Sequence, residues 1–201
     1  MDWSRCDKGA LATGDCNGQI YVYHPTESGW NVNLSPFLSH RASVEDIQWS
    51  PSEPTVFASC SVDRTIKIWD TRSKGHKSML SVNAHASDVN VISWNRQVGY
   101  LLVSGSDDGT FRVWDFRNNL WERGGGMTCR SCSVGDFSYL NAPITSVEWS
   151  PHDSSVLAVS SDDQLTIWDL SLEAESANEK QDVPPQLLFV HAVGEEACVH
   201  V

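Results

Sequence analysis

The sequence has few basic residues and no long apolar run. Its longest apolar stretches, such as residues 99–103, are far shorter than the roughly 20 residues that a membrane-spanning helix needs. Lysines and arginines number 14 against 26 aspartates and glutamates, which gives a formal net charge of −12 at pH 7. Nucleic-acid binding depends on clustered basic side chains that neutralise phosphates. The short apolar runs therefore argue against a membrane span, and the charge balance argues against direct nucleic-acid binding. The acidic balance either favours basic protein partners or simply aids solubility.

A secretion signal is also missing from the start of the chain. Residues 1–7 are charged and contain no apolar core of the kind that a signal peptide requires. We therefore expect an intracellular protein whose six cysteines are reduced.

Signatures of catalysis and metal binding are absent as well. The sequence contains no GxSxG, P-loop or HExxH motif and no paired Cys–His pattern. Its CxxC at residues 129–132 has no second pair nearby and is weak evidence for zinc. The aspartate pairs at 107–108 and 162–163 fall in expected hairpin turns, where aspartate is favoured for backbone reasons. We predict no enzymatic activity, no cofactor and no metal site.

The chain does contain an internal repeat. The stretch TIKIWD at residues 65–70 returns as TFRVWD at 110–115 and as LTIWD at 165–169. An earlier tryptophan precedes the anchor residue of each unit by 19 or 20 positions: Trp3 and Tyr23, Trp49 and Trp69, Trp94 and Trp114, Trp149 and Trp168. A constant inner spacing with connections of variable length indicates a repeated supersecondary unit.

Short apolar runs and polar turns alternate within each unit. One run per unit combines β-branched and small side chains: residues 56–61, 101–106 and 156–161. Such runs suit strands that are buried on both faces. The polar residues that follow, such as 62–64, tolerate the geometry of a tight hairpin. The pattern predicts an all-β protein built from short, evenly spaced strands.

These units resemble WD40 repeats, which form the four-stranded blades of β-propellers. The resemblance implies an all-β partial WD40 propeller with about four blades and an unclosed ring. The expected segments are a degenerate first unit at 1–39, WD repeats at 40–84, 85–122 and 140–171, an irregular insertion at 123–139, an acidic flexible loop at 172–185 and a truncated further blade at 186–201. Because unclosed sheets leave exposed edges, we expect the chain to be marginally stable or to depend on a partner.

In WD40 proteins each blade is locked by a loop histidine, a strand serine or threonine, a turn aspartate and the repeat tryptophan. A buried indole N–H needs an acceptor, and a neutral histidine can both donate and accept. The matching residues are His40, Asp63 and Trp69, then His85, Asp108 and Trp114, and finally Asp162 and Trp168. Leu140 stands at the position of the third histidine. The resemblance therefore implies a structural role for these residues rather than a catalytic or metal-binding one.

Several stretches resemble the glutamate-rich WD-repeat proteins of the nucleolus, a family related to the histone-binding WD proteins. These stretches are residues 1–4, 43–51, 88–94, 143–149 and 184–191. The resemblance implies a nuclear and nucleolar chaperone that binds a basic large-subunit ribosomal protein, and also histones, in ribosome biogenesis. The chain departs from the family at 120–139 and 192–198, and it lacks the acidic extension and first blades. We expect a truncated or alternatively spliced product, or a faulty gene model.

Two features are candidates for partner binding. The motif Trp-Asp-x-Arg, which ends in Arg72 and Arg117, resembles the box by which WD substrate receptors dock on the adaptor of a cullin-RING ubiquitin ligase. These arginines are expected at a blade edge, free to contact an acidic surface, unless they are only exposed strand ends. An acidic insertion resembles a loop that grips basic segments in histone-binding relatives, with a solvated linker as the alternative. Its acidic residues are Glu173, Glu175, Glu179 and Asp182.

Overall fold

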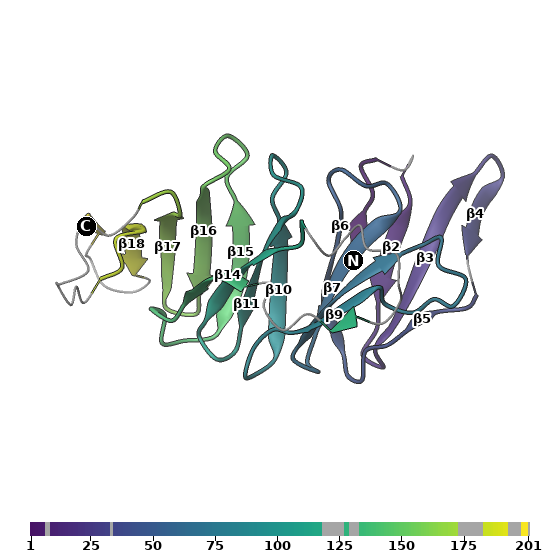
Figure 1. The fold of residues 1–201 in the computed structure, drawn as a ribbon, viewed down its shortest axis with the longest axis horizontal. Coiled ribbons are helices and arrows are strands. Elements are labelled where there is room, and N and C mark those ends of the chain that lie inside the picture. The colour runs from purple at the N-terminus through teal and green to yellow at the C-terminus, as the bar shows by residue number, and fades with distance from the viewer. Residues whose placement is uncertain are drawn as a thin grey trace.

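The computed structural model describes residues 1–6, 9–32, 34–117, 127–128, 133–172, 183–192 and 198–200. Within these ranges the chain forms strands that are joined by turns and loops. No helix of the described residues is long and apolar enough to cross a membrane. The strands form four largely antiparallel sheets that stand side by side in a row (Figure 1). The first and last sheets lie at opposite ends of the row, so the predicted all-β fold with an unclosed ring is confirmed.

Each sheet contains a run of strands that follow one another in the sequence. The first contains β1 (Asp2–Trp3), β2 (Leu11–Gly14), β3 (Gln19–Thr26), β4 (Gly29–Val32) and β5 (Phe37–Leu38). The second contains β6 (Val44–Trp49), β7 (Val56–Ser61), β8 (Thr65–Asp70) and β9 (Leu80–Asn83), with β13 (Met127–Thr128) parallel to β9. The third contains β10 (Val89–Trp94), β11 (Leu101–Ser106), β12 (Phe111–Asp115) and β14 (Ser133–Phe137). The fourth contains β15 (Ile144–Trp149), β16 (Val156–Ser161), β17 (Gln164–Asp169), β18 (Leu187–Ala192) and β19 (Cys198–His200).

Part of the segment expected to be an irregular insertion forms a strand. Residues 133–137 are β14, the outer strand of the third sheet, and they pair with β12. The ring of Phe137 stacks on Phe111 at a centroid distance of 4.6 Å, and Asp136 lies 3.3 Å from the Arg112 guanidinium. Only one side chain of this five-residue strand is a large apolar anchor, so its polar sequence concealed a strand that pairs at a sheet edge.

The segment 186–201, expected to begin a further blade, contributes a strand to the fourth sheet instead. Its strand β18 pairs with β17 and completes the fourth sheet. Leu187 faces Trp168 in this pairing and is buried with it in one apolar cluster. Burial against the preceding tryptophan holds the strand in the sheet of its own repeat. The two residues are separated by the 18 residues 169–186, so the contact leaves no local sequence signal.

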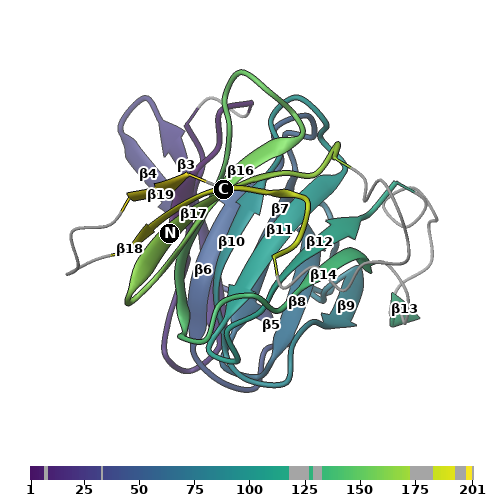
Figure 2. The same ribbon diagram turned by 90° about the vertical axis from the view of Figure 1, so that its left-hand side faces the viewer.

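Apolar clusters fill the spaces between neighbouring sheets. Between the first two sheets, Phe37 meets the edges of Phe57 and Trp69 at centroid distances of 5.5 and 5.8 Å. Every residue of β7 is buried, as a strand that is covered on both faces requires. Viewed along the row, the four sheets overlap one another (Figure 2). The core is therefore a series of layers between sheets, and each sheet depends on its neighbours.

The first strands of adjacent sheets are joined by a repeated hydrogen bond. The residue before each strand-ending tryptophan accepts the backbone N–H of the next such tryptophan along the row. Asp2 Oδ2 accepts from Trp49 N at 2.8 Å, and Gln48 Oε1 accepts from Trp94 N at 2.8 Å. Ser93 repeats the contact with Trp149 N at 3.4 Å. These bonds set the register of one sheet against the next.

Candidate functional site

The predicted locking residues of the second sheet meet around a serine that sequence reasoning did not name. Ser59 Oγ accepts the indole N–H of Trp69 at 2.8 Å and lies 2.7 Å from His40 Nε2. His40 Nδ1 lies 2.9 Å from Asp63 Oδ2. Because the Asp63 carboxylate can only accept, the neutral His40 ring carries its proton on Nδ1 and donates it to Asp63, and Nε2 accepts the hydroxyl proton of Ser59. A signal was available in the sequence: Ser59 precedes its tryptophan by ten residues, as Ser104 does.

The environment of this chain of hydrogen bonds keeps its histidine neutral. Burial lowers the pKa of His40, and the nearby Asp63 carboxylate offsets only part of that effect. Burial would raise the pKa of Asp63, but hydrogen bonds from His40 and Thr65 hold it well below its usual range. The pair is therefore a neutral imidazole and a carboxylate at neutral pH, joined by a hydrogen bond rather than by an ion pair.

The third sheet repeats the arrangement, except that its histidine forms the closer contact with the Thr110 hydroxyl rather than with the aspartate. Ser104 Oγ accepts from Trp114 Nε1 at 2.8 Å and lies 2.7 Å from His85 Nε2. His85 Nδ1 contacts the Thr110 hydroxyl at 2.8 Å and is 3.6 Å from Asp108. Burial lowers the pKa of His85 to about 4, so this histidine is also neutral at pH 7.

The fourth sheet buries its tryptophan without a histidine. Trp168 Nε1 donates to Thr166 Oγ1 at 2.8 Å, and Val159 occupies the strand position that Ser59 and Ser104 hold. Leu140 is buried at the site of the missing histidine. Asp162 is exposed and makes no hydrogen bond within the described part of the chain, so the structure does not join it to Trp168. Sequence reasoning missed Thr166, whose only signal is its place two residues before the tryptophan.

The two motif arginines are exposed but not free. Arg72 Nε and Nη2 donate to both carboxylate oxygens of Asp70, at 2.7 to 3.0 Å, and its side chain is 70% exposed. Arg117 Nη2 donates to Asp115 at 2.8 Å, and its guanidinium lies 4.3 Å from the centre of the Tyr100 ring. The expectation that the guanidinium groups are free is wrong, because the aspartate of each motif already pairs with its arginine. Whether the arginines contact a partner stays a prediction.

The stacking of the sheets gathers acidic side chains at one end of the molecule, here called the hairpin end. The hairpins between the second and third strands of the sheets all point to this end, and Val44 N donates to Asp15 O of the neighbouring hairpin at 3.1 Å. The carboxylates here are Asp15, Glu45, Asp63, Asp88, Asp107, Asp108, Asp162 and Asp163. Arg41 and Arg64 also lie here. The predicted acidic loop residues, Glu173, Glu175, Glu179 and Asp182, lie outside the described residues, as do residues 129–132.

Comparison with known proteins identifies the class. The family model for the WD domain, G-beta repeat, matches residues 32–70, 76–115 and 133–169, which is more than half of the chain. The chain therefore belongs to the WD40-repeat family. A chain in the crystal structure of the mitotic checkpoint complex has the same fold, with a TM-score of 0.73 and 23% identity over 96% of this chain and 50% of that one.

Three relatives are more similar in sequence. The Arabidopsis thaliana Protein HEAT STRESS TOLERANT DWD 1 is 55% identical over 95% of this chain, and the Schizosaccharomyces pombe Ribosome assembly protein rrb1 is 47% identical over 95%. The Dictyostelium discoideum Glutamate-rich WD repeat-containing protein 1 is 57% identical over 36% of this chain and 15% of its own length. The similarity to glutamate-rich WD-repeat proteins is thereby confirmed. The chain spans 42% and 40% of the length of the first two relatives.

Proposed function

We propose that the chain is part of a non-enzymatic WD40 chaperone that holds a basic client, a large-subunit ribosomal protein or a histone, during ribosome biogenesis in the nucleus and nucleolus. Two relatives support this role through their names, one as a ribosome assembly protein and one as a glutamate-rich WD-repeat protein. The observation that carries the proposal is the concentration of carboxylates at the hairpin end. Such a surface attracts basic segments and loses that attraction as salt screens it.

The exposed carboxylates of the hairpin end are different residues from the aspartates that hold the blades together. Asp107, Asp162 and Asp163 are exposed at the tips of two hairpins, and Glu45 is exposed at the start of β6. Asp63 and Asp108 are used instead to hold the backbone of their own blades, through Arg41 N and Ala86 N. The outer acids are therefore available to a client while the inner ones maintain the surface that carries them.

Charge reversal at the two ends tests the proposal. The variant Glu45→Lys/Asp162→Lys changes the hairpin end, and Glu27→Lys/Glu53→Lys makes the same change of charge at the other end. We expect the first variant to weaken binding to histones and to a basic large-subunit ribosomal protein several-fold, and the second to leave it within about twofold. Equal loss in both variants would show that overall charge, not this surface, holds the client.

The motif arginines support a second candidate, docking on the adaptor of a cullin-RING ubiquitin ligase. Both guanidinium groups lie at the end opposite the hairpins, with side chains 70% and 60% exposed. Pairing with Asp70 and Asp115 orients each group and leaves its outer edge toward solvent, so an adaptor would bind an arginine–aspartate pair rather than a lone charge.

Binding of the purified adaptor to Arg72→Ala/Arg117→Ala tests this second candidate. The control is Lys74→Ala/Lys77→Ala, which removes two exposed charges from the same end. We expect capture of the adaptor to fall at least about tenfold in the arginine variant only, as loss of two charge-assisted contacts predicts. Unchanged capture would remove the arginines from any docking role.

A further inference from the structure

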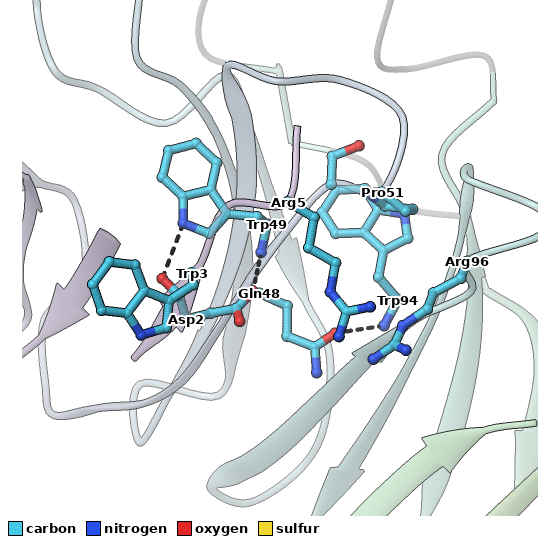
Figure 3. A pocket seen from close by; sticks show the side chains of 9 residues that line it. Asp2, Trp3, Arg5, Gln48, Trp49, Pro51, Trp94 and Arg96 are labelled. Carbon is cyan, nitrogen blue, oxygen red and sulfur yellow. Dashed lines mark hydrogen bonds between the residues drawn. The ribbon is translucent and has the colours of Figure 1, made fainter. Parts of the chain in front are cut away.

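A pocket opens where the first three sheets meet, at the end opposite the hairpins (Figure 3). It has a volume of about 230 Å³ and is lined by residues that include Trp3, Arg5, Gln48, Trp49, Trp94 and Arg96. Arg5 follows β1, Gln48 lies in β6 and Arg96 follows β10, so each of the three sheets contributes a polar side chain. The pocket therefore exists only when the sheets are stacked.

The acceptors that line this pocket are already engaged. The Asp2 carboxylate accepts the backbone N–H of Trp49 at 2.8 Å, and the Asp2 carbonyl accepts its indole N–H at 3.1 Å. The amide oxygen of Gln48 accepts the backbone N–H of Trp94 at 2.8 Å. These are the bonds that set the register between sheets, so a ligand cannot take them over without loosening the fold.

The donors, in contrast, are unused. Among the residues that the structure describes, neither Arg5 nor Arg96 has a hydrogen bond or ion pair, and the amide nitrogen of Gln48 has none either. Figure 3 shows the Arg5 and Arg96 side chains extending into the pocket beside the Gln48 amide. The Asp2 carboxylate also lines the pocket, but no ion pair joins it to either arginine in the described part of the chain. A carboxylate placed between the two guanidinium groups would therefore gain attraction from both.

The walls of the pocket are aromatic. Trp49 and Trp94 are 5% and 3% exposed and form its inner side. Trp3, at the rim, is 52% exposed and lies 5.6 Å from Trp30, which is equally exposed. An exposed pair of indoles beside unpaired arginines provides apolar contact next to anion recognition, the combination that is enriched in the centres of protein interfaces.

We propose that this pocket binds an acidic segment of a partner protein, with a carboxylate between Arg5 and Arg96 and an apolar side chain against Trp3. Two arginines and a small volume match one or two side chains of a peptide. They do not match a nucleic acid, which requires an extended basic surface that this chain of net charge −12 lacks. The pocket lies at the end opposite the hairpin end, and it would bind an acidic segment rather than a basic client. A failure of either binding proposal therefore does not affect the other.

Fluorescence anisotropy with a labelled decapeptide that alternates glutamate and leucine tests the proposal. We expect saturable binding to the 201-residue chain that weakens at least about tenfold in Arg5→Glu/Arg96→Glu, because two charge-assisted hydrogen bonds are replaced by repulsion. The matched control, Lys74→Glu/Lys77→Glu, changes charge equally at the same end but outside the pocket, and its affinity should stay within about twofold. Circular dichroism confirms that each variant keeps its strands.

A second variant and two further probes complete the test. Trp3→Ala removes a half-exposed ring and no charge, and we expect it to lower the affinity for the same peptide about fivefold. The peptide with glutamine in place of glutamate should not bind. The proposal is overturned if the wild-type chain shows no saturable binding, if the glutamine peptide binds equally well, or if both charge-reversal variants weaken binding alike. It is also overturned if a ten-nucleotide RNA binds more tightly than the peptide and loses its affinity in Arg5→Glu/Arg96→Glu.

Discussion

The second and fourth sheets bury the same side chain in the same way with different partners. Trp69 and Trp168 are both fully buried, and each donates its indole N–H to a hydroxyl at 2.8 Å. In the second sheet the hydroxyl belongs to Ser59 on the middle strand and is itself held by His40. In the fourth sheet it belongs to Thr166 on the tryptophan's own strand and donates to the Val159 carbonyl at 3.0 Å.

This comparison separates what the blade requires from what it adds. The requirement is an acceptor for a buried indole N–H, since an unpaired buried donor costs about 1–3 kcal/mol. The histidine and aspartate are an addition that ties the hairpin to the preceding loop through Arg41 N. The fourth sheet fills the histidine site with Leu140 instead, so its hairpin is held by packing.

Removal of the buried tryptophan should have the largest effect on stability, and this effect should be similar in the two sheets. Trp69→Ala and Trp168→Ala each remove a fully buried indole, and each should lower the free energy of unfolding by about 4–5 kcal/mol. Urea denaturation followed by circular dichroism measures both. A cost that is much smaller in the fourth sheet would mean that the histidine network, rather than burial, determines the contribution of the tryptophan.

Removal of the hydroxyl that accepts the indole N–H should cost more stability in the second sheet than in the fourth. Ser59→Ala leaves two buried groups unpaired, the Trp69 indole N–H and His40 Nε2, and should cost about 3–4 kcal/mol. Thr166→Val leaves the Trp168 indole N–H unpaired and also removes the hydrogen bond to the Val159 carbonyl, and it should cost about 1–3 kcal/mol. The same denaturation series measures the difference, and equal costs would contradict the additional role assigned to the histidine.

The buried histidines should make the second and third sheets sensitive to mild acid. Burial holds the pKa of His85 at about 4 in the folded state, against about 6.5 in the unfolded chain. At this site the unfolded state therefore binds more protons between these values, and His85 contributes a loss of about 3 kcal/mol as pH drops from about 6.5 to 4. His40 acts in the same direction because its pKa is lowered too. Asp46 contributes with the opposite sign over part of this window, because burial raises the pKa of its carboxyl to about 6 in the folded state. In His85→Leu, which copies Leu140, the fall in unfolding free energy over this window should shrink, and an unchanged slope would exclude His85 as its source.

The smallest effect concerns the exposed motif arginines. Arg72→Ala breaks an ion pair whose arginine side chain is 70% exposed, so solvent screens the pair and stability should hardly change. Thermal unfolding measures this change, with Lys77→Ala as a control for loss of an exposed charge. A clear fall in melting temperature in Arg72→Ala but not in Lys77→Ala would indicate that Arg72 holds the blade together and is not primarily a surface for partners.

Much of the architecture follows from the order of residues alone. The spacing of the tryptophans and the short β-branched runs predict repeated blades, because burial on both faces leaves a local apolar pattern. The anchors Trp69, Trp114 and Trp168 could be named for the same reason, and His40 and His85 follow from their match to the repeat. The strand β14 could not be predicted, because its residues 133–137 are held by pairing with β12 and not by their own pattern.

The details that bear on function come from contacts between distant segments. The Trp69 indole finds its acceptor, Ser59, on the neighbouring strand, and this contact depends on the pairing of β7 with β8. Where Val159 replaces that serine, the Trp168 indole uses Thr166 on its own strand. The pocket between Arg5 and Arg96 joins residues 91 positions apart and forms only when three sheets stack. A repeat pattern records which residues each blade buries. It does not record which unpaired donors the stacked blades bring together, because that depends on the register between sheets, which Asp2, Gln48 and Ser93 set.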